Sequence, residues 1–194
     1  MSAAQRARET GIASSRAAIR AAANAIRAAH RRQWDDAVAR SEECRRLLDE
    51  AQDALREFPG IYHAGFLHDA EKEYVEARVT LALLQDEEPP GPAELRVGDP
   101  AYLNGVAETV GELRRFLLDR LREQHFERGE ELLAHMDEIV DQLASLDDPD
   151  AMTGGLRRST DVARAILERT RGDLTATTVQ ARLTRALEDH PRER

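Results

Sequence analysis

The sequence predicts an all-α protein that folds as one helical domain. Alanine and leucine dominate the composition and β-branched residues are thinly represented, which favours helix over strand. Apolar residues recur with the period of an α-helix along most of the chain, and no segment shows the alternation typical of a strand. A chain of 194 residues is long enough for a substantial core. We therefore expect residues 1–194 to form a single bundle of six or seven helices.

The composition also indicates the cellular compartment in which we expect the protein. No apolar run approaches the ~20 residues needed to cross a bilayer, and residues 1–9 lack the apolar centre of a signal peptide. One cysteine, Cys44, allows neither an internal disulfide nor a cysteine zinc site. We expect a cytoplasmic protein with no membrane partner. The net charge is −9 and Lys72 is the one lysine among 28 basic residues, a balance typical of a salt-adapted or GC-rich source.

The first predicted helix covers residues 2–31 and carries a stripe of arginines. Ile12, Ile19 and Ile26 repeat every seven residues and indicate a narrow apolar seam. Within an arc of about 80° on another side lie Arg6, Arg16, Arg20, Arg27 and Arg31. Two interpretations stay open. The arginines form a solvated face paired with acids of a neighbouring helix, or they contact the phosphates of a nucleic acid.

The remaining helices are separated by prolines and glycines. Helical periodicity extends over residues 33–57, 61–85, 101–124, 127–146, 156–170 and 175–188. Residues 86–100 hold four of the seven prolines and are predicted to be a loop. Two helices joined by a loop of this length are expected to pack antiparallel. The helices at 61–85 and 101–124 should therefore be neighbours.

Acidic residues on these two helices are the candidate functional site. Glu73 falls inside an apolar stripe of the helix at 61–85 and Glu76 lies at its edge, where a carboxylate is costly unless something pairs with it. On the helix at 101–124, Glu108 and Glu112 share a face with i, i+4 spacing. If the two pairs converge, four carboxylates surround one space, which suits Mg²⁺ or Mn²⁺. In a chain so rich in acids, chance spacing and a solvated face are the plainer explanation.

Two glycines and one missing motif bear on this hypothesis. Gly105 and Gly111 flank the second pair of glutamates, and each costs a helix roughly 1 kcal/mol relative to alanine. Close packing of another backbone, or room for a ligand, would justify that cost. A di-iron carboxylate bundle would need Glu-x-x-His on two helices, and the sequence has no such motif.

Two motifs resemble the translin superfamily. They are Glu-Tyr-Val-Glu-Ala at residues 73–77 and the segment at residues 101–115 that contains Gly-Val-Ala-Glu and Gly-Glu-Leu. The likeness is closer to the translin-associated factor X branch than to translin. The basic spacing over residues 15–31 and the segment beginning Leu156-Arg157-Arg158 are also similar to this family. The resemblance covers most of the chain, although only the two central motifs are specific.

The resemblance implies a seven-helix fold and a function. Members of the family form closed barrels, commonly octamers, that enclose single-stranded RNA or DNA, and the factor X branch is an Mg²⁺-dependent endoribonuclease. Carried over by position, the catalytic and metal-binding residues are Glu73, Glu76, Glu108 and Glu112. Glu108 stands where better-known relatives have aspartate. Under this hypothesis the strand is held inside a homo-oligomer by arginines of the first helix, namely Arg16, Arg20, Arg27 and Arg31.

Two alternatives remain at this stage. The chain could be a non-catalytic shell that binds single-stranded RNA or DNA, with its carboxylates satisfying each other or the arginines. It could also be an all-α nucleotide pyrophosphohydrolase, which likewise arranges glutamates on facing helices around Mg²⁺. That class prefers i, i+3 spacing on both helices, and the spacing of Glu108 and Glu112 departs from it.

Overall fold

The protein is all-α, as predicted. The computed structural model describes residues 2–63, 65–146 and 150–189, and these contain helices and no strand. In chain order the helices are α1 (Ala3–His30), α2 (Trp34–Leu55), α3 (Pro59–Tyr62), α4 (Gly65–Leu84), α5 (Pro92–Leu95), α6 (Asp99–Arg122), α7 (Phe126–Ala144), α8 (Asp150–Thr153) and α9 (Leu156–Glu188). Among these residues, six helices are long and α3, α5 and α8 have four residues each. No described helix combines the length and apolar character needed to span a membrane.

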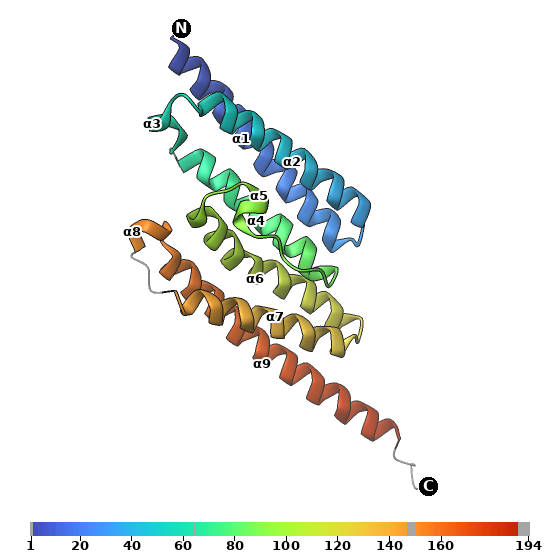
Figure 1. Cartoon of the computed structure of the whole chain (residues 1–194). Helices are drawn as coiled ribbons and strands as arrows, with labels where there is room; N and C mark the ends of the chain where they lie inside the picture. Colours follow the sequence, from blue (N-terminus) through green and yellow to red (C-terminus); the bar gives the residue numbers. More distant parts are fainter. Residues whose placement is uncertain (1, 64, 147–149, 190–194) are drawn as a thin grey trace.

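The central helices α4 and α6 lie between two helix pairs. The α1–α2 hairpin packs on α4, and α7 and α9 pack on α6 (Figure 1). Helix α4 is buried around most of its circumference, with apolar side chains such as Leu67, Val75 and Val79 almost fully enclosed. From residue 70 to the end of α4, every polar residue is therefore buried or half-buried, whereas Asp69 is exposed.

Helices α4 and α6 run parallel, so the antiparallel packing predicted from the loop is wrong (Figure 1). At the far end of the pair, Arg128, near the start of α7, donates hydrogen bonds to the carbonyls of Leu83 and Leu84 at the end of α4. A helix of 20 residues is about 30 Å long. Residues 85–98 can run back over that distance because an extended chain spans about 3.3 Å per residue.

The returning loop is fixed to α2 by polar contacts. Arg45 donates a hydrogen bond of 2.7 Å to the carbonyl of Leu95, and Gln52 donates one of 3.2 Å to the carbonyl of Arg96. Gln52 also donates to Glu71, a carboxylate of α4 with only 7% of its surface exposed. Burial raises the pKa of Glu71 despite this hydrogen bond. The buried Glu71 thus helps to hold the loop that allows α4 and α6 to run in the same direction.

Helix α1 buries a different face from the one predicted. Its core residues are small: Ala18, Ala21, Ala22, Ala25, Ala28 and Ala29. The predicted isoleucine seam lies at the edge of this face, because Ile26 is buried whereas Ile19 is only partly covered. Small side chains let α2 approach closely along the full length of the hairpin. The arginine stripe consequently lies on the opposite, solvent-facing side.

Helix α9 is continuous, although two helices were predicted over residues 156–170 and 175–188. The segment has no proline, and the cost of about 1 kcal/mol for Gly172 is too small to break a packed helix. Leu174 is the last buried residue of α9, and the helix then projects beyond the bundle (Figure 1). The other predicted bounds differ by a few residues, most at 61–85, where α3 precedes α4.

Candidate metal centre and nucleic-acid interface

Helices α4 and α6 touch at Gly105. A Cβ atom at this position would lie 2.6 Å from the backbone oxygen of Lys72 and 2.7 Å from Cβ of Val75, so only glycine fits. This is the close backbone approach expected for an interior glycine. Gly111 is different, since a Cβ there would meet no atom within 4 Å. The contact at Gly105 brings the two helices close together beside the acidic residues that they carry.

Three of the four predicted carboxylates come together beside this contact. Carboxylate oxygens of Glu73, Glu76 and Glu108 all lie within 4.8 Å of one another. Each of the three side chains is only partly exposed. The i, i+3 pair of α4 therefore faces the first acid of α6, which is the convergence predicted from the sequence, although the helices run parallel.

The fourth acid, Glu112, is held by α1. Its carboxylate accepts a hydrogen bond from Nε2 of His30, a side chain that is only 6% exposed. This hydrogen bond lowers the pKa of Glu112 and outweighs the effect of burial. Glu112 still lies near the cluster, because its charge raises the pKa values of Glu73 and Glu76. Sequence reasoning missed His30 because its partner lies 82 positions away, and no local pattern marks it.

The cluster holds more negative charge than its surroundings neutralise. Lys72 pairs with Glu108 at 2.6 Å. Within the described residues, neither Glu73 nor Glu76 has a side-chain hydrogen bond or ion pair. Burial, followed by the charges of Glu73, Glu108 and Glu112, raises the pKa of Glu76 to about 8. Carboxylates so placed fit a hard divalent cation such as Mg²⁺ or Mn²⁺, whose preferred ligands are oxygens.

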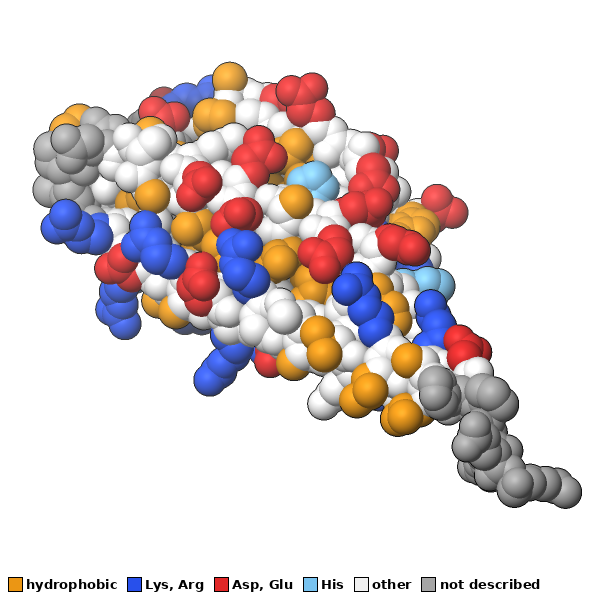
Figure 2. Space-filling model, turned by 90° about the horizontal axis from the view of Figure 1, so that it is seen from below, with side chains coloured by type: hydrophobic (Ala, Val, Ile, Leu, Met, Phe, Trp, Pro, Cys, Tyr) orange, Lys and Arg blue, Asp and Glu red, His pale blue; other side chains and the backbone are white. Residues whose placement is uncertain are grey.

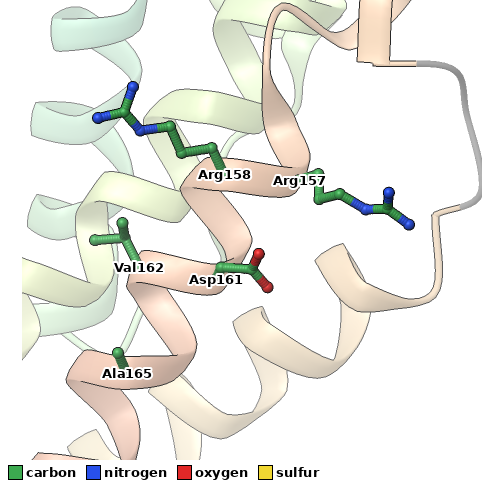
Figure 3. Close-up of a pocket in the computed structure, with 5 residues that line it drawn as sticks. All are labelled: Arg157, Arg158, Asp161, Val162 and Ala165. Carbon is green, nitrogen blue, oxygen red and sulfur yellow. The ribbon is translucent and has the colours of Figure 1, made fainter.

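A pocket of about 430 Å³ lies beside the cluster. Glu76, Ala107 and Glu108 form one wall, and α9 supplies Arg158, Ser159, Val162 and Ile166. The start of α9 is anchored to α6, because Ser159 donates a hydrogen bond of 2.6 Å to Asn104, whose amide in turn donates to the carbonyl of Thr153. A second pocket of similar volume follows α9 and is lined by Arg157, Arg158, Asp161, Val162 and Ala165 (Figure 3).

The predicted nucleic-acid-binding arginines are all exposed, three of them on α1 and Arg31 at its C-cap. These are Arg16, Arg20, Arg27 and Arg31. Arg27 bonds to Asn24, and Arg31 donates to the carbonyl of Arg27. In the part of the chain that the structure describes, Arg16 and Arg20 form no hydrogen bond or ion pair, so pairing with a neighbouring helix does not explain them. Only the end of the stripe near His30 approaches the acids, since Arg16 lies about 21 Å further along α1.

The fold and the site define a class: an all-α bundle with a carboxylate cluster between two parallel central helices. The crystal structure of AfC3PO superposes with a TM-score of 0.84 and 34% sequence identity, covering 92% of this chain and 93% of that chain. AfC3PO in a complex with duplex RNA matches with the same TM-score and identity over 92% of each chain. This chain therefore belongs to the translin superfamily, the family of these C3PO proteins.

Two further comparisons give similarity in fold and in part of the sequence. The structure of apo-NeC3PO has the same fold, with a TM-score of 0.79 and 20% identity over 89% of this chain and 90% of that chain. A protein of Methanocaldococcus jannaschii, uncharacterized protein MJ0175, is 30% identical over 122 residues, which are 62% of this chain and 54% of that protein. The chain thus matches about half the length of this curated relative. No protein-family model matches the sequence.

Proposed function

We propose that the protein is a divalent-metal-dependent endoribonuclease that binds and cleaves RNA. The observation that carries the proposal is the cluster of Glu73, Glu76 and Glu108, whose oxygens converge within 4.8 Å beside an open pocket. The 34% identity to AfC3PO, which has been seen in a complex with duplex RNA, supports RNA as the ligand. Assignment to the factor X branch remains a prediction.

Each acidic residue has a role in this proposal. Glu73, Glu76 and Glu108 hold Mg²⁺ or Mn²⁺, and Glu112, kept ionised by His30, supplies a fourth carboxylate at the edge of the site. A divalent cation in such a site activates water and neutralises the charge of a phosphodiester. The arginines of α1, chiefly Arg16, Arg20, Arg27 and Arg31, contact more distant phosphates of the same strand.

The proposed assembly is a closed homo-oligomer, with an octamer as the form expected from the family. Hydrophobic side chains are uncovered toward the tapering end of the molecule where α9 projects (Figure 2). Val179, Leu183 and Leu187 are each more than half exposed, and their i, i+4 spacing places them on one face of α9. A second copy of the chain would remove this stripe from water.

One observation favours a second candidate, a shell that binds single-stranded RNA or DNA without cleaving it. Lys72 already pairs with Glu108 and His30 with Glu112, so two of the four acids have partners without a metal ion. In that case the carboxylates only stabilise the packing of α1, α4 and α6. A cleavage assay separates the two candidates.

The deciding experiment compares wild type with Glu73→Gln. A 5′-labelled unstructured RNA and a matched duplex are incubated with Mg²⁺, with Mn²⁺ or with EDTA. We expect the single strand to be cut only when a divalent ion is present, and the glutamine variant to bind RNA without cutting it. Glu130→Gln, an exposed glutamate on α7, serves as the matched control and should behave as wild type.

Cleavage that survives in Glu73→Gln would refute the site assignment. RNA binding by wild type without cleavage in either metal would favour the non-catalytic shell. Release of pyrophosphate from nucleoside triphosphates in the same buffers would point to the pyrophosphohydrolase alternative instead.

A further inference from the structure

The pocket beside the acidic cluster has walls of opposite charge. Glu76 and Glu108 line it from α4 and α6, and Arg158 lines it from α9. Within the described residues, the exposed guanidinium of Arg158 forms no hydrogen bond or ion pair. It is therefore available to a ligand, unlike Arg114, which is bound to Asp173 at 2.8 Å, or Arg128, which is bound to Asp86 at 2.5 Å.

Arg158 also marks the point where two pockets meet. The pocket at the acids and the pocket along α9 share Arg158 and Val162, so the two pockets adjoin each other at these residues. In Figure 3, Arg158 and Arg157 leave α9 in opposite directions, and Val162 and Ala165 follow along the helix. Arg158 thus lies between the carboxylates of the first pocket and the mixed charged and apolar lining of the second.

The position of Arg158 is fixed by its neighbour in the chain. Ser159 is tied to Asn104, and Asn104, only 4% exposed, is in turn tied to the carbonyls of Pro100 and Thr153. These bonds join α6, α8 and the first turn of α9. A side chain on such an anchored turn meets a ligand with little loss of backbone freedom, as a binding residue should.

We propose that Arg158 contacts the RNA backbone and binds the phosphate next to the one at the acidic cluster. The inference rests on the proposed function, because it takes the strand to lie at the acids. A metal ion there neutralises the carboxylates but leaves the neighbouring phosphate unpaired. A guanidinium suits that phosphate because its planar donors bind two oxygens at once. Val162 and Ile166 then face the sugar and base of the same nucleotide.

The test is the salt dependence of RNA binding in EDTA, where no cleavage occurs. A fluorescent unstructured RNA is titrated with wild type, Arg158→Ala, Arg158→Lys and Arg171→Ala at several salt concentrations. Arg171 is the matched control, because it lies on α9, is exposed, lines neither pocket and pairs with Asp137 of α7 at 2.8 Å. Thermal melts of each variant establish that the fold is retained.

We expect Arg158→Ala to weaken binding about tenfold and to reduce the slope of log Kd against log salt by about 0.7, the value for one phosphate of a single strand. Arg158→Lys should retain most of the slope but not the full affinity, and Arg171→Ala should match wild type. If wild type binds RNA and Arg158→Ala binds with the same affinity and slope, the inference is overturned while the proposed function stands. If wild type itself binds no RNA, the proposed function falls, and this inference falls with it.

Discussion

Glu76→Gln is expected to stabilise the metal-free protein at alkaline pH, although it removes a residue of the proposed site. The pKa of Glu76 is raised from 4.5 to about 8, first by burial and then by the charges of Glu73, Glu108 and Glu112. The folded state therefore binds this proton more tightly than the unfolded state does. The contribution of the protonated Glu76 to the free energy of unfolding is complete below pH 4.5 and is lost as the pH rises through about 8.

A shift of this size corresponds to at most about 5 kcal/mol of unfolding free energy. Glu76 keeps some contact with water, so we expect about 2 kcal/mol. Glutamine is uncharged like the protonated acid, so the Glu76→Gln variant does not lose this stability as the pH rises. For a chain of this length, about 2 kcal/mol is about 4 to 8 °C in melting temperature.

Circular-dichroism melts in EDTA at about pH 5, 7 and 9 measure the effect. The melting temperature of Glu76→Gln should equal that of wild type at the lowest pH and exceed it by about 4 to 8 °C at the highest. Saturating Mn²⁺ at the highest pH should raise the melting temperature of wild type and have little effect on the variant, since a bound ion compensates the clustered charge. A difference that does not change with pH, or a variant less stable than wild type in alkaline buffer, would refute the reasoning.

Two further predictions concern packing and assembly. Gly105→Ala should lower the free energy of unfolding in urea by at least about 2 kcal/mol, because the added Cβ meets the backbone of Lys72. Gly111→Ala, the control, should be neutral or stabilising by up to about 1 kcal/mol. Equal effects of the two substitutions would contradict the close approach of α4 and α6. Leu183→Arg should shift the protein to smaller species in light scattering after gel filtration, while Arg185→Ala, outside the apolar stripe of α9, should not. An unchanged mass for Leu183→Arg would exclude this stripe as a contact between subunits.

Local sequence patterns were sufficient for the helices and for part of the site. Among the described residues, the apolar period and the prolines located five of the six long helices to within a few residues, whereas α9 was predicted as two helices. A glutamate in an apolar stripe indicated that Glu73 meets other polar groups, and an interior glycine indicated the close contact at Gly105. These patterns are informative because each depends on one helix and its own faces.

Other features were decided by tertiary structure alone. The direction of α6 relative to α4 depends on Arg45 and Gln52 of α2, which hold the returning loop. The partner of Glu112 is a histidine of α1, and the arginine that shares a pocket with Glu76 and Glu108 comes from α9. Each of these contacts joins residues many positions apart, and which faces of the helices meet is settled only when the whole core packs. The sequence by itself thus determined which segments are helical and where acidic residues interrupt their apolar faces, and packing determined which of those residues come together.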